Sequence, residues 1–151
     1  MSQAPHKADL AVFAVFTEIG IIEQLARTAF TRQLPDGLQM AHFALLNHMV
    51  RLGDGWTPVR LAKAFQLTKG AISNTTGRLE ARGLIRIEAD ADDRRSKRVF
   101  ITDAGRAAWQ ACIAALRPQL ARIREELGVE VFDQALPALQ SVRAWLDAER
   151  D

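Results

Sequence analysis

Residues 57–102 read TPVRLAKAFQLTKGAISNTTGRLEARGLIRIEADADDRRSKRVFIT, and the order of elements in this stretch decides the fold. The opening Thr57-Pro58 pair is typical of a helix start, because threonine can accept a hydrogen bond from an unpaired N–H and proline has no N–H to leave unpaired. Two helices are therefore expected, over residues 58–65 and 69–82, with a tight turn between them.

After Gly83 the spacing of apolar residues changes from that of a helix to the alternation of a strand. Ile85 and Ile87 alternate with charged neighbours, and Val99 and Ile101 repeat the pattern beyond a polar, charged segment. This pattern predicts an antiparallel hairpin with a long charged loop. Helix, turn, helix and hairpin in this order form a winged helix-turn-helix, whose second helix can enter the major groove of DNA.

Buried contacts are expected to hold the two helices of this motif together, with Ile72, Thr76 and Leu79 of the second helix facing the core. The other residues expected in this core are Leu61, Ala62 and Leu67. The opposite face of the second helix then points outward, where hydroxyl and amide groups can bond to base edges. The candidate DNA contacts on this face are Thr68, Lys69, Gly70, Ser73, Asn74 and Arg78, with Gly77 beside them.

Basic charge is concentrated in the same stretch. The whole chain has a net charge of +2, which alone says little about partners. Residues 57–102 carry ten basic and five acidic side chains, a net charge of +5, so the rest of the chain has a net charge of −3. Such a local excess of positive charge is the electrostatic footprint of a DNA-binding surface.

Three segments together resemble the MarR (multiple antibiotic resistance regulator) family of bacterial transcription regulators. They are LTKGAIS at residues 67–73, RLEARGLI at residues 78–85 and DDRRSKRVFITDAG at residues 92–105. Each segment alone is weak evidence, whereas all three at this spacing are specific. The resemblance implies a winged helix-turn-helix regulator whose N- and C-terminal helices intertwine in a homodimer.

The resemblance also implies that the hairpin carries an Asp-x-Arg motif, whose arginine enters the minor groove and whose aspartate steadies it. Two registers fit this chain, Asp92 with Arg94 and Asp93 with Arg95, and the sequence does not choose between them. A solvated hairpin whose charges neutralise one another is the alternative. The candidate DNA contacts in the hairpin are Asp92, Asp93, Arg94, Arg95, Lys97 and Arg98.

Apolar residues at helical spacing extend on both sides of the motif. They predict helices over residues 5–30 and 38–52 before it, and over residues 103–127 and 130–148 after it. Large apolar stripes outside a DNA-binding module commonly form a twofold interface. We therefore expect a homodimer, in which each chain is mainly α with a small antiparallel β-hairpin.

The 151 residues suit a single domain, here residues 1–151. Within it we expect the DNA-binding lobe over about residues 38–102 and dimerisation helices over about residues 5–32 and 103–148. The longest apolar stretch is much shorter than the roughly 18 residues of a membrane span, so a cytoplasmic protein is expected.

Neither a metal nor a cofactor is expected. Cys112 is the single cysteine, which excludes an internal disulfide and a cysteine-rich zinc site, and its position on an apolar stripe favours a packing role. His42 and His48 are six residues apart, so they do not share a helix face as metal ligands would. We expect His42 to lie at the surface. No nucleophile or phosphate-loop motif is present, which argues against an enzyme.

These features predict a sequence-specific regulator that binds double-stranded DNA as a homodimer on a palindromic operator. By the resemblance it is a repressor whose DNA affinity is lowered by a small aromatic or phenolic effector, although no ligand-binding residue can be named. Two alternatives remain open. One is a winged-helix protein-interaction module that binds no DNA, and the other is a redox or ligand sensor without direct operator binding.

Overall fold

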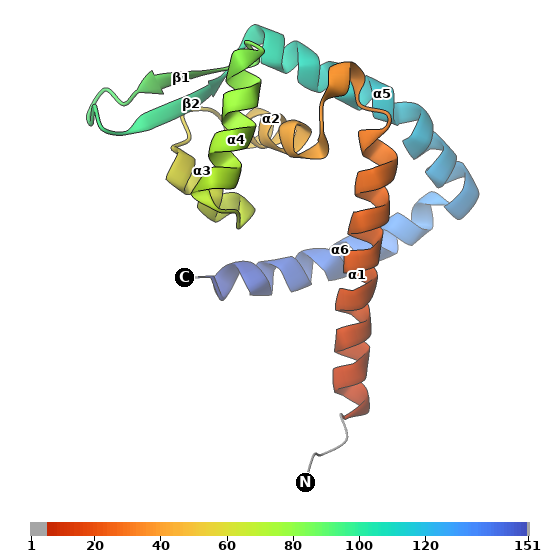
Figure 1. The fold of residues 1–151 in the computed structure, drawn as a ribbon. Helices are drawn as coiled ribbons and strands as arrows, with labels where there is room; N and C mark the ends of the chain where they lie inside the picture. Colours follow the sequence, from red (N-terminus) through yellow and green to blue (C-terminus); the bar gives the residue numbers. More distant parts are fainter. Residues whose placement is uncertain (1–5, 151) are drawn as a thin grey trace. The chain divides into compact units, whose positions relative to one another are not determined.

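The computed structural model describes residues 6–150, which are mainly helical with a single two-stranded antiparallel sheet (Figure 1). The elements in chain order are α1 (Lys7–Thr31), the 3-10 turn η1 (Pro35–Gly37), α2 (Met40–Leu52), α3 (Pro58–Phe65), α4 (Lys69–Ala81), β1 (Ile85–Ala89), β2 (Lys97–Ile101), α5 (Asp103–Leu127) and α6 (Val129–Ala148). The predicted fold class is confirmed, whereas the helix start expected at residue 5 lies outside the described residues.

The chain divides into two compact units, of which the first ends at Ala115 and the second begins at Leu116. The first unit contains α1 to β2 and the N-terminal half of α5. The second contains the rest of α5 and all of α6. Within residues 6–150, no helix combines the length and the apolar character that a membrane crossing requires.

The helices of the motif begin and end where their capping residues predict. Thr57 Oγ1 accepts a hydrogen bond from the N–H of Arg60 at 3.3 Å, and Thr68 Oγ1 accepts one from the N–H of Ala71 at 3.1 Å. Gly83 follows the end of α4 with a φ of 68°, a conformation that costs glycine little. Local capping therefore determines the bounds of α3 and the start of α4.

The helix α2 begins at Met40, two residues later than predicted. Leu38 has extended backbone angles, and a reciprocal capping box between Gln39 and His42 starts the helix instead. The Nδ1 atom of His42 accepts the N–H of Gln39 at 3.1 Å. A histidine in the third position of a helix is a weak sequence signal for such a box, which explains the shift.

The core of the first unit lies between α2, the helix-turn-helix and the sheet. Its fully buried side chains include Leu45, Leu46, Met49, Leu61, Ile72, Leu79, Ile85, Val99 and Cys112. The prediction that Leu67 is buried is wrong, since this side chain is 48% exposed. The backbone holds the turn here, because the N–H of Leu67 donates to the carbonyl of Ala62 at 3.0 Å.

The wing consists of β1 and β2 together with the loop that precedes α3. The two strands pair from Ile85 opposite Ile101 to Ala89 opposite Lys97. On the other edge of β2, Val99 forms an antiparallel bridge with Trp56. The Val99 N–H donates to the Trp56 carbonyl at 2.9 Å, and the Val99 carbonyl accepts the N–H of Gly55 at 3.0 Å. The wing is therefore attached to the α2–α3 loop.

The end of α4 and the start of α5 meet at a close junction. The carbonyl of Leu84, just after α4, accepts a hydrogen bond from the N–H of Thr102 at 3.1 Å. The Thr102 hydroxyl donates to the Gly83 carbonyl at 2.7 Å and accepts the N–H of Gly105 at 3.0 Å. A Cβ atom on Gly105 would lie 2.0 Å from the Leu84 carbonyl oxygen, so only glycine fits this position.

The junction predicts that Gly105→Ala destabilises the protein by about 1–3 kcal/mol, the usual cost of overpacking. Urea unfolding followed by circular dichroism measures the loss. Gly77→Ala is the matched control, because nothing lies within 4 Å of the added methyl and the residue is inside α4. This control should gain about 0.5–1 kcal/mol from helix propensity. Equal effects of the two substitutions on the unfolding free energy would contradict the close packing of Gly105 against Leu84.

Candidate nucleic-acid interface

The helix α4 presents the predicted face to solvent. Ile72, Thr76 and Leu79 are buried, and the Thr76 hydroxyl donates to the Ile72 carbonyl at 2.8 Å. The predicted outward residues are all exposed; they are Thr68, Lys69, Gly70, Ser73, Asn74, Gly77 and Arg78. The structure therefore brings the α4 candidates together on one exposed surface, where the Thr68 hydroxyl also caps the helix.

The tip of the wing is closed by Asp93. Its Oδ1 atom accepts the backbone N–H of Arg95 at 3.0 Å, and its carbonyl accepts the N–H of Ser96 at 2.9 Å. The side chains of Arg94 and Arg95 are exposed. Asp93 thus holds the backbone at Arg95, whereas the Asp92 side chain makes no hydrogen bond or ion pair within residues 6–150.

Arg98, the second residue of β2, bonds through its side chain within the protein, unlike the other basic residues of the wing that are predicted to contact DNA. Its Nε atom donates to Asp90 Oδ2 at 2.6 Å, and its Nη1 atom donates to the Gly55 carbonyl at 2.8 Å. The other Asp90 oxygen accepts the N–H of Asp92 at 2.9 Å. This N–H bond and the Arg98 guanidinium lower the pKa of Asp90. The guanidinium is engaged within the protein, so Arg98 braces the wing against the α2–α3 loop.

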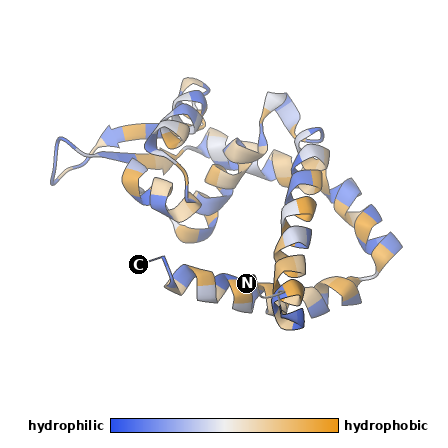
Figure 2. Ribbon diagram, turned by 60° about the horizontal axis from the view of Figure 1, so that its bottom comes forward, coloured by the Kyte–Doolittle hydropathy of each residue, from blue (hydrophilic) through white to orange (hydrophobic). Residues whose placement is uncertain are grey.

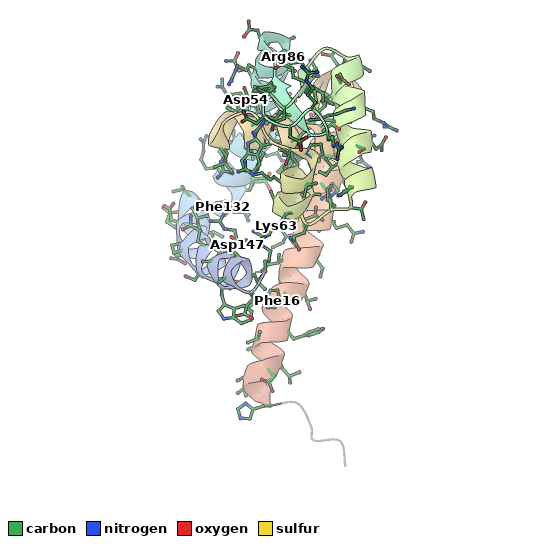
Figure 3. All side chains as sticks on the ribbon, turned by 90° about the vertical axis from the view of Figure 1, so that its left-hand side faces the viewer. Phe16, Asp54, Lys63, Arg86, Phe132 and Asp147 are labelled. Atoms are coloured by element: carbon green, nitrogen blue, oxygen red, sulfur yellow. The ribbon has the colours of Figure 1, made fainter. Side chains whose placement is uncertain are left out.

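The other basic side chains in and beside the motif fall into two groups, those that pair with a carboxylate and those that do not. Arg86 pairs with Glu88 at 2.5 Å, and Arg106 pairs with Asp54 of the α2–α3 loop at 3.5 Å; both Arg86 and Asp54 are labelled in Figure 3. Some exposed cations make no ion pair with any carboxylate of the described residues; they include Arg60, Lys69, Arg78, Arg94, Arg95 and Lys97. Those on α4 and at the wing are the ones that sequence analysis selected.

The two histidines of α2 both lie in partly or fully buried surroundings, which differs from the surface position expected of His42. His42 is buried rather than at the surface, because it caps α2 beneath α4. Burial lowers its pKa, and the positive charges of Arg82 and Arg78 lower it further. Burial and the nearby Arg51 also lower the pKa of His48. The Nε2 atom of His48 is buried without a hydrogen-bond partner among the described residues.

The remaining candidates for sensing or metal chemistry lie in the core. Cys112 is fully buried, and burial raises the pKa of its thiol, which agrees with a packing role. Trp109 Nε1 donates to Asn47 Oδ1 at 3.1 Å, which ties α5 to α2. No group of three histidine, cysteine or carboxylate side chains in residues 6–150 is arranged to hold a metal ion.

A pocket of about 380 Å³ lies between α1, α2 and the helix-turn-helix. Its walls are mainly apolar and include Phe30, Met40, Ala44, Leu45, Phe65 and Leu67. Arg27 and Glu23, which form an ion pair on α1, supply charge at its edge. Ile72 and Thr75 of α4 also line it, so a molecule bound here would touch the helix that carries the outward face. The exposure of Leu67 is explained by this pocket.

Comparison with known proteins identifies relatives of this arrangement. Residues 36–96 match the model of the MarR family. The transcriptional regulator BldR from Sulfolobus solfataricus is 26% identical, with a TM-score of 0.72 over 91% of this chain and 99% of that chain. BpsR of Bordetella bronchiseptica, whose DNA binding is regulated by 6-hydroxynicotinic acid, is 22% identical, with a TM-score of 0.73 over 86% and 98%. Wild-type MarR from E. coli is 20% identical, with a TM-score of 0.71 over 93% and 98%.

The buried His42 predicts that stability falls in acid. Because its folded pKa is below the ordinary value of about 6.5, the unfolded chain binds the proton first as the pH drops. The unfolding free energy should therefore decrease below about pH 6.5 and level off below the folded pKa. His42→Gln should flatten this decrease, since glutamine can complete the capping box without titrating.

Urea unfolding of both proteins between pH 7.5 and pH 5 measures the effect. His48 also has a lowered pKa, so the variant should keep part of the pH dependence. A variant as pH-dependent as the wild type would show that His42 is not held neutral in the fold.

Proposed function

We propose that this chain, whose residues 36–96 match the model of the MarR family, is a transcription regulator of that family that binds an operator in double-stranded DNA as a homodimer and represses transcription there. The family consists of transcription regulators rather than enzymes. The observation that carries the proposal is the common exposure of the α4 face and of the wing residues Arg94, Arg95 and Lys97. The cations among them form no ion pair with a carboxylate of the described residues. Such a regulator would act in the cytoplasm with the DNA.

We propose that α4 enters the major groove. Ser73 and Asn74 lie one turn into the helix and are exposed, so their side chains can bond to base edges, and asparagine suits adenine. Gly70 and Gly77 allow the backbone to approach the duplex closely. Lys69 and Arg78 supply charge for phosphates, while Thr68 caps the helix.

In the wing, we propose that Arg95 enters the minor groove and that Asp93 steadies it. The hydrogen bond from the Arg95 N–H to Asp93 supports this register over that of Asp92 with Arg94. Arg94 and Lys97 then contact phosphates. Arg98 braces the wing instead of contacting DNA, because its Nε and Nη1 donors bond to Asp90 and Gly55 and its charge is paired with Asp90.

The homodimer is supported by apolar surface in each unit that the described residues leave exposed. On α1, Phe13 is 70% exposed and Leu25 is 66% exposed. On α6, Trp145 is 63% exposed and Leu136 is 55% exposed, and Figure 2 shows hydrophobic residues along both helices. Burial of such surface against a second copy would be favourable. Two copies of α4 then suit a palindromic operator with half-sites one helical turn apart.

The pocket beside α4 supports regulation by a small molecule. Its apolar walls suit an aromatic ring, and Arg27 could reach an anionic group of a ligand by exchanging its ion pair with Glu23. A relative of similar fold, BpsR, responds to a hydroxylated aromatic acid. We therefore propose that a small aromatic anion binds this pocket and shifts α4 through Ile72 and Thr75.

Selection of bound fragments from random DNA tests operator binding and the dimer together. We expect enriched fragments with two inverted half-sites whose centres are about 34–36 Å apart. Light scattering should give twice the chain mass of 16.8 kDa. A monomer that enriches no fragment even at low salt would contradict the proposal.

On the selected operator, Arg95→Gln should weaken binding about tenfold or more, because both half-sites lose a minor-groove contact. Arg94→Gln should weaken it less, as expected for a phosphate contact alone. Arg32→Gln is the matched control, since this exposed arginine lies at the end of α1, outside the lobe. A larger loss for Arg94→Gln would favour the other register.

The pocket predicts that a substitution can remove the response to ligand while DNA binding remains. Ala44→Phe should fill the cavity, because Ala44 lies in its wall on α2. Fluorescence anisotropy of labelled operator is measured with salicylate, benzoate and 6-hydroxynicotinate. At least one should release DNA from the wild type but not from the variant. The assignment of the pocket would be contradicted if a compound released DNA equally from the wild type and the variant. It would also be contradicted if none of the three compounds released DNA from the wild type.

A further inference from the structure

Trp56, in the loop between α2 and α3, is held from three directions. Its Nε1 atom donates to the Gly53 carbonyl at 2.7 Å. Its backbone pairs with Val99 of the wing. The ring of His48 meets it edge-on, with the ring centroids 4.4 Å apart. The indole therefore has a fixed position at the outer edge of the wing sheet.

The fixed indole supports the guanidinium of Arg60. The Cζ atom of Arg60 lies 4.5 Å from the centroid of the Trp56 ring, which is a cation–π arrangement. Arg60 is exposed, and no carboxylate in the described part of the chain forms an ion pair with it. Stacking uses the face of a guanidinium and leaves the N–H donors at its edge free for other acceptors.

The arrangement differs from the other stacked arginine of the lobe. Arg86 lies over Phe100 at 4.8 Å, but its Nε atom also pairs with Glu88 at 2.5 Å. The charge of Arg86 is therefore compensated inside the protein. Arg60 is held in place by an aromatic ring while its charge remains uncompensated, which is the arrangement expected of an anion-binding side chain.

The position of Arg60 in the fold points to a DNA backbone phosphate as the anion that it binds. Its helix, α3, leads through the tight turn into α4, and Trp56 extends the wing sheet beyond β2. Arg60 thus lies on the element that connects the proposed major-groove helix to the proposed minor-groove wing. The sugar-phosphate backbone separates adjacent grooves of a duplex, so a cation between the two reading elements faces phosphates. The helix α3 contains no acidic residue that would oppose this contact.

We propose that Arg60, positioned by Trp56, binds a DNA backbone phosphate between the two grooves that the lobe occupies. This inference rests on the proposed DNA-binding function. Arg60 makes the contact through the free edge of its guanidinium, and Trp56 acts as a positioning residue. The contact sets the register of the lobe on the duplex and carries no base preference.

Salt dependence of binding measures such a contact. Affinities of the full-length wild type and the Arg60→Gln variant are determined at several salt concentrations, on the selected operator and on an unrelated duplex. The slope of log affinity against log salt should fall by about one per protomer in the variant. The loss should be similar on both duplexes. Arg32→Gln, which removes the same charge, should leave the slope unchanged.

A variant of the ring tests the positioning role. Trp56→Leu should weaken operator binding when Arg60 is present and have little further effect in the Arg60→Gln variant. Trp56→Phe, which keeps an aromatic face, should restore part of the affinity. If Trp56→Leu weakens both backgrounds equally, the ring does not act through Arg60. Thermal unfolding confirms that the variants are folded, and the Arg60→Gln comparison stands by itself because this side chain is exposed.

The result that overturns the inference is distinct from failure of the proposed function. If Arg60→Gln keeps the wild-type slope of log affinity against log salt while Arg95→Gln reduces it, the phosphate contact of Arg60 is excluded. The proposed DNA binding is then unaffected. If the wild type binds neither duplex at low salt, the proposed function fails, and this inference fails with it.

Discussion

The pairing of Val99 with the loop before α3 is the interaction on which the DNA-binding lobe depends. A hairpin of two short strands is at best marginally stable in water by itself. Here the Val99 backbone bonds on its outer edge to Gly55 and Trp56, and its side chain is fully buried. The wing thereby becomes part of the helical core. The Arg98 brace and the indole that supports Arg60 both lie at this edge.

The elements that sequence analysis predicted well are those with local causes. The start of α3 follows from Thr57 and Pro58, and the outward face of α4 follows from the spacing of Ile72, Thr76 and Leu79. Hydrogen bonds between near neighbours and helical periodicity are visible in one sequence. For this reason the fold class and the α4 candidates could be derived before the structure was known.

The parts that could not be predicted depend on residues far apart in the chain. Arg98 resembles its basic neighbours, and only the fold brings it to the carbonyl of Gly55, 43 residues away. His42 is polar, yet its capping bond and its position beneath α4 bury it. Leu67 is apolar, yet it lines an open pocket. A count of basic residues therefore overstates the charge available to DNA, because Arg86 and Arg98 are already neutralised by carboxylates.

The contact of Gly105 with the Leu84 carbonyl has a mechanical consequence. No side chain separates Gly105 from the Leu84 carbonyl, and Thr102 bonds to both Gly83 and Leu84. The first turn of α5 is therefore packed closely against the residues that follow α4. A rotation of this turn is expected to move the end of α4 with it. We therefore expect a tilt of α4 to involve the start of α5 as well, because the chain has little freedom to bend between them.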